Sequence, residues 1–166
     1  MSKQSENKKD HIISIALPKS FIGFLTVFSQ DHYGYSITAL EETTLCFIEI
    51  ELIQEIILNN GGFALNVLSK ISEVSHEIIY KRVNIYSKRL RGRIAYLLIV
   101  LSKEIFFKTR FDLPVTRREI GELIGMSTAN VIRVFSEFQR DNIVKINRSA
   151  IEITNFSMLE KVSKYG

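Results

Sequence analysis

Residues 116–140, TRREIGELIGMSTANVIRVFSEFQR, constrain the fold most strongly, because they carry two short helical patterns that meet at one glycine. Thr116 and Glu119 have the spacing of a capping box, in which each side chain satisfies a backbone N–H of the other's turn. Gly125 suits the left-handed conformation that ends a helix, and Ser127 offers a new N-cap two residues later. The stretch therefore predicts two helices joined by a tight turn.

Each predicted helix has an inward and an outward face. Ile120, Leu123 and Ile124 point inward from the first helix, where Gly121 has no side chain and permits a close approach. The inward residues of the second helix recur at spacings of three and four: Val131, Val134, Phe135 and Phe138. The outward residues are Thr128, Ala129, Ile132, Arg133 and Ser136. From periodicity alone, the alternative is an αα-hairpin that merely packs.

A helix pair of this kind can place its second helix in the major groove of DNA, which makes the outward residues candidates for base contacts. Arg133 can donate a fork of hydrogen bonds to guanine O6 and N7, and such a fork discriminates by roughly 1–3 kcal/mol against a wrong base. Thr128, Ala129 and Ile132 offer methyl contacts to thymine, and Thr128 or Asn130 can hydrogen-bond a base or a phosphate. The candidates for phosphate contacts, which give register rather than sequence information, are Thr116, Arg117 and Ser136.

Two alternating strands are predicted next, at 143–146 and 150–154, around the tip Asn147-Arg148-Ser149. A helix-turn-helix followed directly by a basic hairpin is the winged arrangement. Arg148 and Lys145 would then reach an adjacent phosphate. The alternative for both residues is a solvent-exposed hairpin charge.

Charge is distributed unevenly along the 166 residues, whose formal net charge is +4. Residues 81–150 hold 15 basic and 6 acidic side chains, whereas residues 1–80 hold 5 and 10. A cationic block of this kind favours a polyanionic partner, although a run of charge is also compatible with an ordinary solvated face.

A long helix is predicted over residues 63–86, after the break Asn59-Asn60-Gly61-Gly62. Its apolar residues follow the narrow 3.5-residue period of a coiled coil, interrupted by Lys81, which favours a dimer interface: Val67, Ile71, Val74, Ile78 and Ile85. The alternative is a helix packed on its own domain. A further helix follows, with a core-facing stripe at Ile94, Leu97, Leu98, Leu101 and Ile105.

The first 60 residues read as part of a β unit. Predicted strands lie at 11–17, 21–27, 35–40 and 44–49, which are too few for a closed sheet, and a short helix follows at 51–58. Cys46 lies in the apolar run LCFI and is expected to be a small buried residue. One cysteine cannot hold a zinc ion or an iron–sulfur cluster, so no metal or other cofactor is expected.

Other function classes leave no sign in the sequence. No apolar run reaches the roughly 18 residues that span a bilayer, and the start MSKQSENKKD is not a secretory signal, so we expect a cytoplasmic protein with no membrane partner. We find no nucleophile–base spacing, paired carboxylate motif, phosphate loop or metal-ligand cluster. The sequence therefore predicts that the chain is not an enzyme.

The residues 93–154 resemble the C-terminal domain of the Crp-Fnr family of regulators, the relatives of the cyclic AMP receptor protein. The likeness rests on LPVTRREIGELIGMSTANVIRVFSEFQRDNIV and on the wing that follows it. Upstream, LPKSFIGFLTVFSQDHYGYSITALEETTLCFIEI is similar to the latter half of the family's β-roll sensor domain, with the long helix after it. Because the family has further strands before HIISIAL, we expect a sensor domain that lacks its first half.

The resemblance implies an α+β protein with three parts. These are a partial β-roll over residues 1–60, a dimerisation helix and hinge over 61–92, and a winged helix-turn-helix over 93–166. It also implies a homodimeric regulator that reads a two-fold symmetric DNA site, with RNA polymerase as a further candidate partner. Residues that match the family's phosphate-contacting and base-reading positions are Thr116, Arg117, Thr128, Ala129 and Arg133.

The sequence departs from the family pattern at several positions. Ala129 stands where an acidic residue is common, and Ile132 stands where Gly or Ser is common. In the sensor half, Gly23-Phe24 and 33–36 (YGYS) lack the Glu and Arg that hold a cyclic phosphate, so we expect no cyclic nucleotide. The alternative function is a truncated interaction protein that dimerises without competent regulation.

Overall fold

The computed structural model describes residues 2–4, 10–12, 15, 16, 20–23, 28, 35–39 and 42–166 of the chain, and it has mixed α+β architecture. The helices are α1 (Ile50–Asn59), α2 (Gly61–Tyr86), α3 (Leu90–Val100), the π-helix η1 (Leu101–Ile105), α4 (Arg117–Ile124), α5 (Thr128–Arg140) and α6 (Phe156–Tyr165). The strands are β1 (Ser2–Gln4), β2 (Asp10–Ile12), β3 (Arg110–Asp112), β4 (Val144–Asn147) and β5 (Ala150–Ile153).

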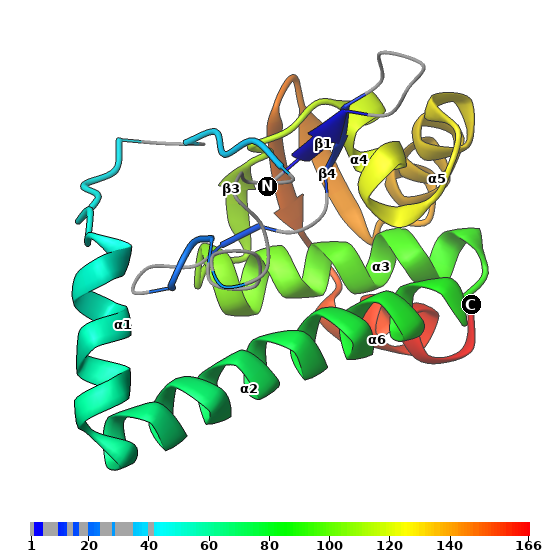
Figure 1. The fold of residues 1–166 in the computed structure, drawn as a ribbon. Helices are drawn as coiled ribbons and strands as arrows, with labels where there is room; N and C mark the ends of the chain where they lie inside the picture. The colour runs from blue at the N-terminus through cyan, green and yellow to red at the C-terminus, as the bar shows by residue number, and fades with distance from the viewer. Residues whose placement is uncertain are drawn as a thin grey trace.

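The long helix α2 runs along one side of the molecule, and α1 stands at its N-terminal end (Figure 1). Asn60 separates the two helices, because its extended backbone ends α1 and its side chain accepts the N–H of Phe63 as the N-cap of α2. The predicted short helix and long helix are both present, each longer by a residue or two than the sequence pattern indicates.

The C-terminal half contains the hydrophobic core. Helices α3, α4, α5 and α6 pack around an antiparallel sheet of order β3-β5-β4, in which Ile151 pairs with both Phe111 and Ile146. The predicted inward residues of both short helices are buried, as are Ile94, Leu97, Leu98 and Leu101 of the α3 stripe. The periodicity therefore identified this core correctly.

Helix α6 is an element that the sequence patterns did not predict. Asn155 caps it by accepting the N–H of Met158, and Leu159 is fully buried against the core. Figure 1 shows α6 lying beside α3. The Asn155 cap and the spacing of Phe156, Leu159 and Val162 are the signals that could have revealed it.

The end of α2 is tied to the helix pair by one side chain, Arg93. Its guanidinium donates hydrogen bonds to the carbonyls of Tyr86 and Lys88, and also to those of Ile124 (3.2 Å) and Gly125 (3.0 Å) at the end of α4. Four carbonyls from two helix ends thus meet on one cation. The Arg93 contacts fix where α4 and α5 lie relative to α2.

The apolar residues predicted to form a dimer interface lie along α2 and are at least half-buried. We call Val67, Ile71, Val74, Ile78 and Ile85 the inner seam. Val67 and Ile85 are buried, and the other three are half-buried. Lys81, which interrupts the inner seam, forms ion pairs with Glu77 (2.7 Å) and with Glu104 of η1 (3.0 Å). Of these five residues, Ile85 belongs to the hydrophobic core of the chain itself, and the predicted dimer interface stays a prediction.

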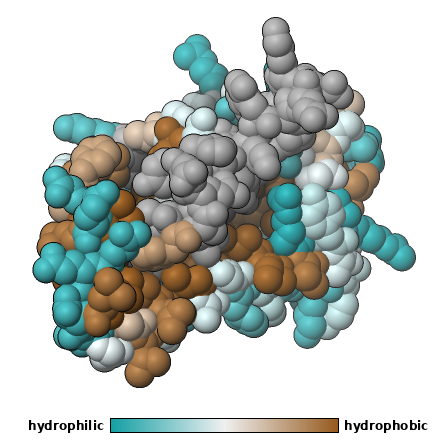
Figure 2. Space-filling view, viewed as in Figure 1, coloured by the Kyte–Doolittle hydropathy of each residue, from teal (hydrophilic) through white to brown (hydrophobic). Residues whose placement is uncertain are grey.

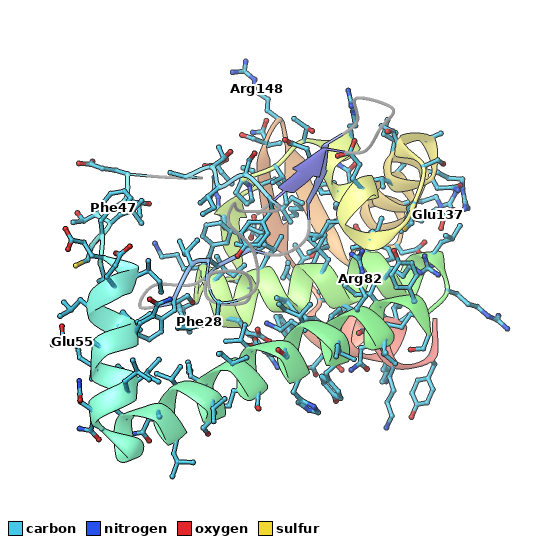
Figure 3. The ribbon with its side chains drawn as sticks, viewed as in Figure 1. Phe28, Phe47, Glu55, Arg82, Glu137 and Arg148 are labelled. Atoms are coloured by element: carbon cyan, nitrogen blue, oxygen red, sulfur yellow. The ribbon has the colours of Figure 1, made fainter. Side chains whose placement is uncertain are left out.

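The N-terminal predictions fare differently. Residues 44–49 form no strand and are exposed, with Phe47 at 90% exposure (Figure 3), so this prediction is wrong. Cys46 is also exposed rather than buried. Of the described residues of predicted strand 11–17, 11 and 12 belong to β2 and 15 and 16 do not; the described residues 35–39 of predicted strand 35–40 contain a single bridge residue. Residues 24–27 of predicted strand 21–27 lie outside the described residues. The high strand propensity of 44–49 was misleading because a strand also requires a neighbour to pair with.

Among the described residues, no helix is both long and apolar enough to cross a bilayer.

Replacing Leu159 by Ala tests whether α6 is part of the core. Because the Leu159 side chain is 0% exposed, we expect the free energy of unfolding to fall by about 2–5 kcal/mol. Met158→Ala is the control, since Met158 is 43% exposed on the same helix. Denaturant titration should separate the two variants, and equal losses would contradict the placement of α6.

Candidate nucleic-acid interface

The predicted capping box starts α4. The Glu119 N–H donates to the Thr116 hydroxyl at 3.3 Å, and the Thr116 N–H donates to the Glu119 carboxylate at 2.7 Å. The Thr116 hydroxyl also donates to that carboxylate at 2.8 Å. Hydrogen bonds from the Thr116 backbone, and then from its side chain, lower the pKa of Glu119. The Thr116 hydroxyl, predicted to contact a phosphate, thus already has partners within its own cap.

The turn between α4 and α5 is as tight as the sequence predicts. Gly125 is left-handed, with φ 66°, and the ring of Tyr86 lies against it, so that a Cβ at this position would be 2.8 Å from the ring. At Gly121, a Cβ would be 2.5 Å from the Met126 carbonyl oxygen. Ser127 then caps α5 by accepting the Asn130 N–H. The absence of a side chain at 121 lets the turn pack closely on α4, and its absence at 125 leaves room for Tyr86 at the end of α2.

Helix α5 presents the predicted outward residues to solvent. The exposed residues are Thr128, Ala129, Ile132, Arg133 and Ser136, and Asn130 beside them is half-buried. The Ser136 hydroxyl donates to the Ile132 carbonyl of its own helix at 3.1 Å. The face thus carries small residues, one branched apolar residue and one arginine along its length.

Arg117, at the start of α4, packs against α5. Its guanidinium stacks over the ring of Phe135 with 4.2 Å to the centroid, and its side chain is half-buried between α4 and α5. Burial lowers the pKa of Arg117. Arg117 therefore has a packing role in the structure, which its position at the start of α4 did not indicate.

The hairpin β4–β5 places Arg148 at its tip. Arg148 has a left-handed backbone, with φ 57°, and its exposed side chain points away from the body of the protein (Figure 3). Ser149 joins the tip to β3 by donating to Asp112 at 3.0 Å. Between the tip and the start of α4 lies a surface hollow of about 400 Å3, lined by Leu113, Pro114, Val115, Thr116, Arg117, Glu119, Arg148 and Ser149.

Two residues beside this face were not singled out from the sequence, Glu137 and Arg91. Glu137 accepts hydrogen bonds from Arg133 (2.7 Å) and from Arg91 (2.9 Å), and Arg91 also donates to Asp141 at 2.7 Å. The hydrogen bond to Asp141 is the main cause that raises the pKa of Arg91. The i,i+4 spacing of Arg133 and Glu137 is visible in the sequence, whereas Arg91 lies 46 residues from Glu137.

Two known domain families match this sequence, and one of them is a helix-turn-helix domain. Residues 92–162 match the Crp-like helix-turn-helix domain, and residues 1–60 match the cyclic nucleotide-binding domain. The chain is thus similar to transcription regulators of the Crp-Fnr family in both its N-terminal and its C-terminal part. The two matched domains correspond to the two ends of the resemblance, and the similarity to transcription regulators agrees with the prediction that the chain is not an enzyme.

Relatives within the Crp-Fnr family include the transcriptional activator protein Anr of Pseudomonas protegens and the transcriptional activator protein FnrA of Stutzerimonas stutzeri. Each is 26% identical over 153 residues, which is 90% of this chain and 62% of the relative. The chain thus spans less than two thirds of the length of these relatives.

Solved structures share the fold. A CRP-family transcriptional regulator from Thermus thermophilus aligns with a TM-score of 0.80 and 14% identity, covering 99% of this chain and 83% of that one. A CRP/FNR-family regulator from the same organism aligns with a TM-score of 0.70 and 18% identity, covering 98% and 81%. The arrangement of the long helix and the helix-turn-helix is therefore that of the family.

Replacing Thr116 by Ala should weaken the capping box and lower the free energy of unfolding by about 1 kcal/mol at neutral pH. The control is Thr128→Ala on the next helix. The cap hydrogen bond of that helix is accepted by the Ser127 side chain and not by Thr128.

The same variant has a pH signature. The pKa of Glu119 is lower in the folded chain than in the unfolded one. Its contribution to the free energy of unfolding is therefore present above the ordinary Glu value of about 4.3 and is lost as pH falls through the lowered value. The difference between the original chain and Thr116→Ala should therefore narrow over that acid range. A difference that stays constant in denaturant titrations would contradict the role of Glu119.

Proposed function

We propose that the chain is a homodimeric, sequence-specific DNA-binding transcription regulator that inserts α5, about Ser127 to Arg140, into the major groove. The observation that carries this proposal is the exposed face of α5 on a capped helix pair whose inner face is fully packed. In the proposed arrangement, residues 1–60 are a sensor-like domain, 61–92 the dimerisation helix and hinge, and 93–166 the DNA-binding domain.

Arg133 is the proposed base-reading donor. It is 55% exposed on the outward face, with Thr128, Ala129 and Ile132 around it. A guanidinium has five N–H donors, so Arg133 can bind a guanine with donors that Glu137 does not occupy. Because Ala129 and Ile132 offer only apolar contacts, the face fits a half-site that combines one guanine with thymine methyl groups.

The wing supplies the proposed phosphate contacts. Arg148 and Lys145 are both exposed on the hairpin, and the hollow between Arg148 and the start of α4 is a concave surface with a cation at its rim. Residues of the cationic block that bind within the protein, such as Arg91 and Arg93, add less to this surface than the net charge of the block indicates.

The dimer is proposed to form through a second apolar row on α2, which we call the outer seam. Its members are spaced by 3, 4, 4, 3 and 4 and are all exposed; four are apolar and two, Ser72 and His76, are polar: Leu65, Leu68, Ser72, His76, Ile79 and Val83. This is the spacing of a coiled coil, and exposed apolar residues at that spacing are stabilised by a partner helix. Ile85 of the inner seam packs into the chain's own core, whereas the outer seam is exposed along its length, so the outer seam is the proposed contact. Figure 2 shows hydrophobic residues, in brown, gathered over α1 and the first turns of α2.

A cyclic nucleotide is not part of the proposal, although residues 1–60 match a cyclic nucleotide-binding domain. The residues at 23–24 (GF) and 33–36 (YGYS) supply neither a carboxylate nor a guanidinium. A bound phosphate would be left without a cationic partner there. Residues 24, 33 and 34 lie outside the described residues.

Selection of bound duplexes from a random pool tests the proposed function and gives the half-site. A discrete dimer–DNA complex, whose affinity falls linearly on a double-logarithmic salt plot, is the expected result. Weak binding that is equal for every sequence would favour the alternative of an interaction protein without competent regulation.

Arg133→Ala should abolish the preference for guanine at one position of each half-site, a loss of roughly 1–3 kcal/mol in discrimination. Arg140→Ala is the matched control, because it removes one positive charge from the same helix at a side chain that is 77% exposed. The control should weaken binding to all duplexes alike. Unchanged base preference in Arg133→Ala, measured by competition binding, would refute the assigned role.

Ile79→Glu should convert a dimer into a folded monomer, since it places a carboxylate in the outer seam. Asn66→Glu is the control, because Asn66 is exposed on α2 outside both seams. Sedimentation at several protein concentrations measures the mass, and circular dichroism checks the fold. A mass that is unaffected by Ile79→Glu but halved by Ile78→Glu would return the interface to the inner seam.

A further inference from the structure

The side chain of Glu137 lies at the centre of a small ion-pair chain behind the outward face of α5. Its Oε1 accepts from Arg133 Nη1 at 2.7 Å, and its Oε2 accepts from Arg91 Nη1 at 2.9 Å. The Glu137 side chain is only 17% exposed, whereas Arg133 is exposed over half of its surface. Figure 3 shows Glu137 at the outer edge of α5. One carboxylate is thus shared by a cation of α3 and a cation of the outward face.

Arg91 holds this carboxylate from behind. It donates to Asp141 at 2.7 Å through its other terminal nitrogen, and its guanidinium lies 5.2 Å from the centroid of the Phe138 ring. Arg91 is therefore fixed by three groups at the C-terminal end of α5. Its position in turn determines where the Glu137 carboxylate can lie, and it neutralises the charge that Glu137 would otherwise present to a polyanion.

Arg133 needs such a support to act as a base reader. An arginine side chain has many rotamers, and ordering it on a base loses their entropy. Glu137 accepts from Nη1, and Asn130 accepts from Nη2 at 3.4 Å, so two of the five N–H donors are directed along the helix. The remaining donors are left to form a fork, and the guanidinium reaches the base with its orientation already set.

A simple surface ion pair would not have this effect, because exposed i,i+4 pairs contribute little and are mobile. The helix-turn-helix offers a comparison in Arg118 and Glu122, which have the same spacing and lie 3.0 Å apart on α4. The pair on α5 differs because its carboxylate is anchored by Arg91 from another helix.

We propose that Glu137 is a positioning residue for base recognition, which orients Arg133 toward guanine and is itself held and neutralised by Arg91. This inference rests on the proposed function, in which Arg133 reads a base. It adds a determinant of specificity that does not itself contact DNA.

The test compares Glu137→Ala, Arg91→Ala and the control Glu122→Ala in the full chain. The probe is the duplex recovered by selection, with each of the four base pairs placed in turn at the guanine position of both half-sites. We expect Glu137→Ala to reduce discrimination for guanine by about threefold to tenfold, a part of what the whole Arg133 fork supplies. Binding to a random duplex should be unchanged or tighter, since one negative charge is removed.

A Glu137→Ala chain that was simply less well folded would bind every duplex more weakly, so lower discrimination without weaker binding to a random duplex distinguishes the positioning role from a loss of folding. Arg91→Ala should change discrimination in the same direction, and Glu122→Ala should leave it unchanged. Glu137→Gln, which keeps one acceptor for Arg133, should retain part of the discrimination. In an Arg133→Ala background, Glu137→Ala should have no effect on base preference, and thermal melts establish that each variant is folded.

The outcomes separate the two proposals. If Arg133→Ala loses guanine preference but Glu137→Ala keeps it or increases it, the positioning role is overturned and the proposed function stands. If Arg133→Ala itself keeps the preference, the base-reading role of Arg133 is refuted and the positioning role of Glu137 falls with it, whereas the selection experiment still decides the proposed function.

Discussion

The guanidinium of Arg93 joins the two halves of the structure. The last carbonyls of a helix have no partner within the helix and carry partial negative charge. Arg93 satisfies such carbonyls at the end of α2 and at the end of α4 with one cation. Tyr86, packed on Gly125, closes the same junction. The direction in which α5 presents its outward face therefore depends on a contact that lies outside the helix-turn-helix itself.

The helix pair and the wing could be predicted from the sequence because their determinants are local. A capping box, a left-handed glycine and an N-cap are each set by residues within four positions of one another, as at Thr116, Gly125 and Ser127. The buried face of α5 follows from its period alone. The turn of the hairpin lies within a residue of the expected place. In these elements, neighbouring residues decide the conformation before any long-range packing is known.

The remaining features depend on partners far away in the sequence. Periodicity finds an apolar row on α2 but does not say what covers it, and the structure shows that Val67 and Ile85 of this row are buried. The strand propensity of residues 44–49 does not tell whether another strand is available to pair with them. Charge counts treat Arg91, Arg93 and Arg117 as surface cations, whereas their hydrogen bonds and ring contacts are made within the protein. In each case, the structure depends on which distant residue makes the contact, and local propensity does not contain that information.

The sharing of one carboxylate by two arginines also has a consequence for how this sequence can change. A single substitution at Glu137 leaves both Arg91 and Arg133 without their common acceptor, so its effect depends on what already occupies position 91. Positions in contact that bind one another in this way accept substitutions in a restricted order. The effects of substitutions at Arg91, Arg133 and Glu137 are therefore expected to be non-additive, so that a change tolerated at one of them depends on the residues already present at the other two.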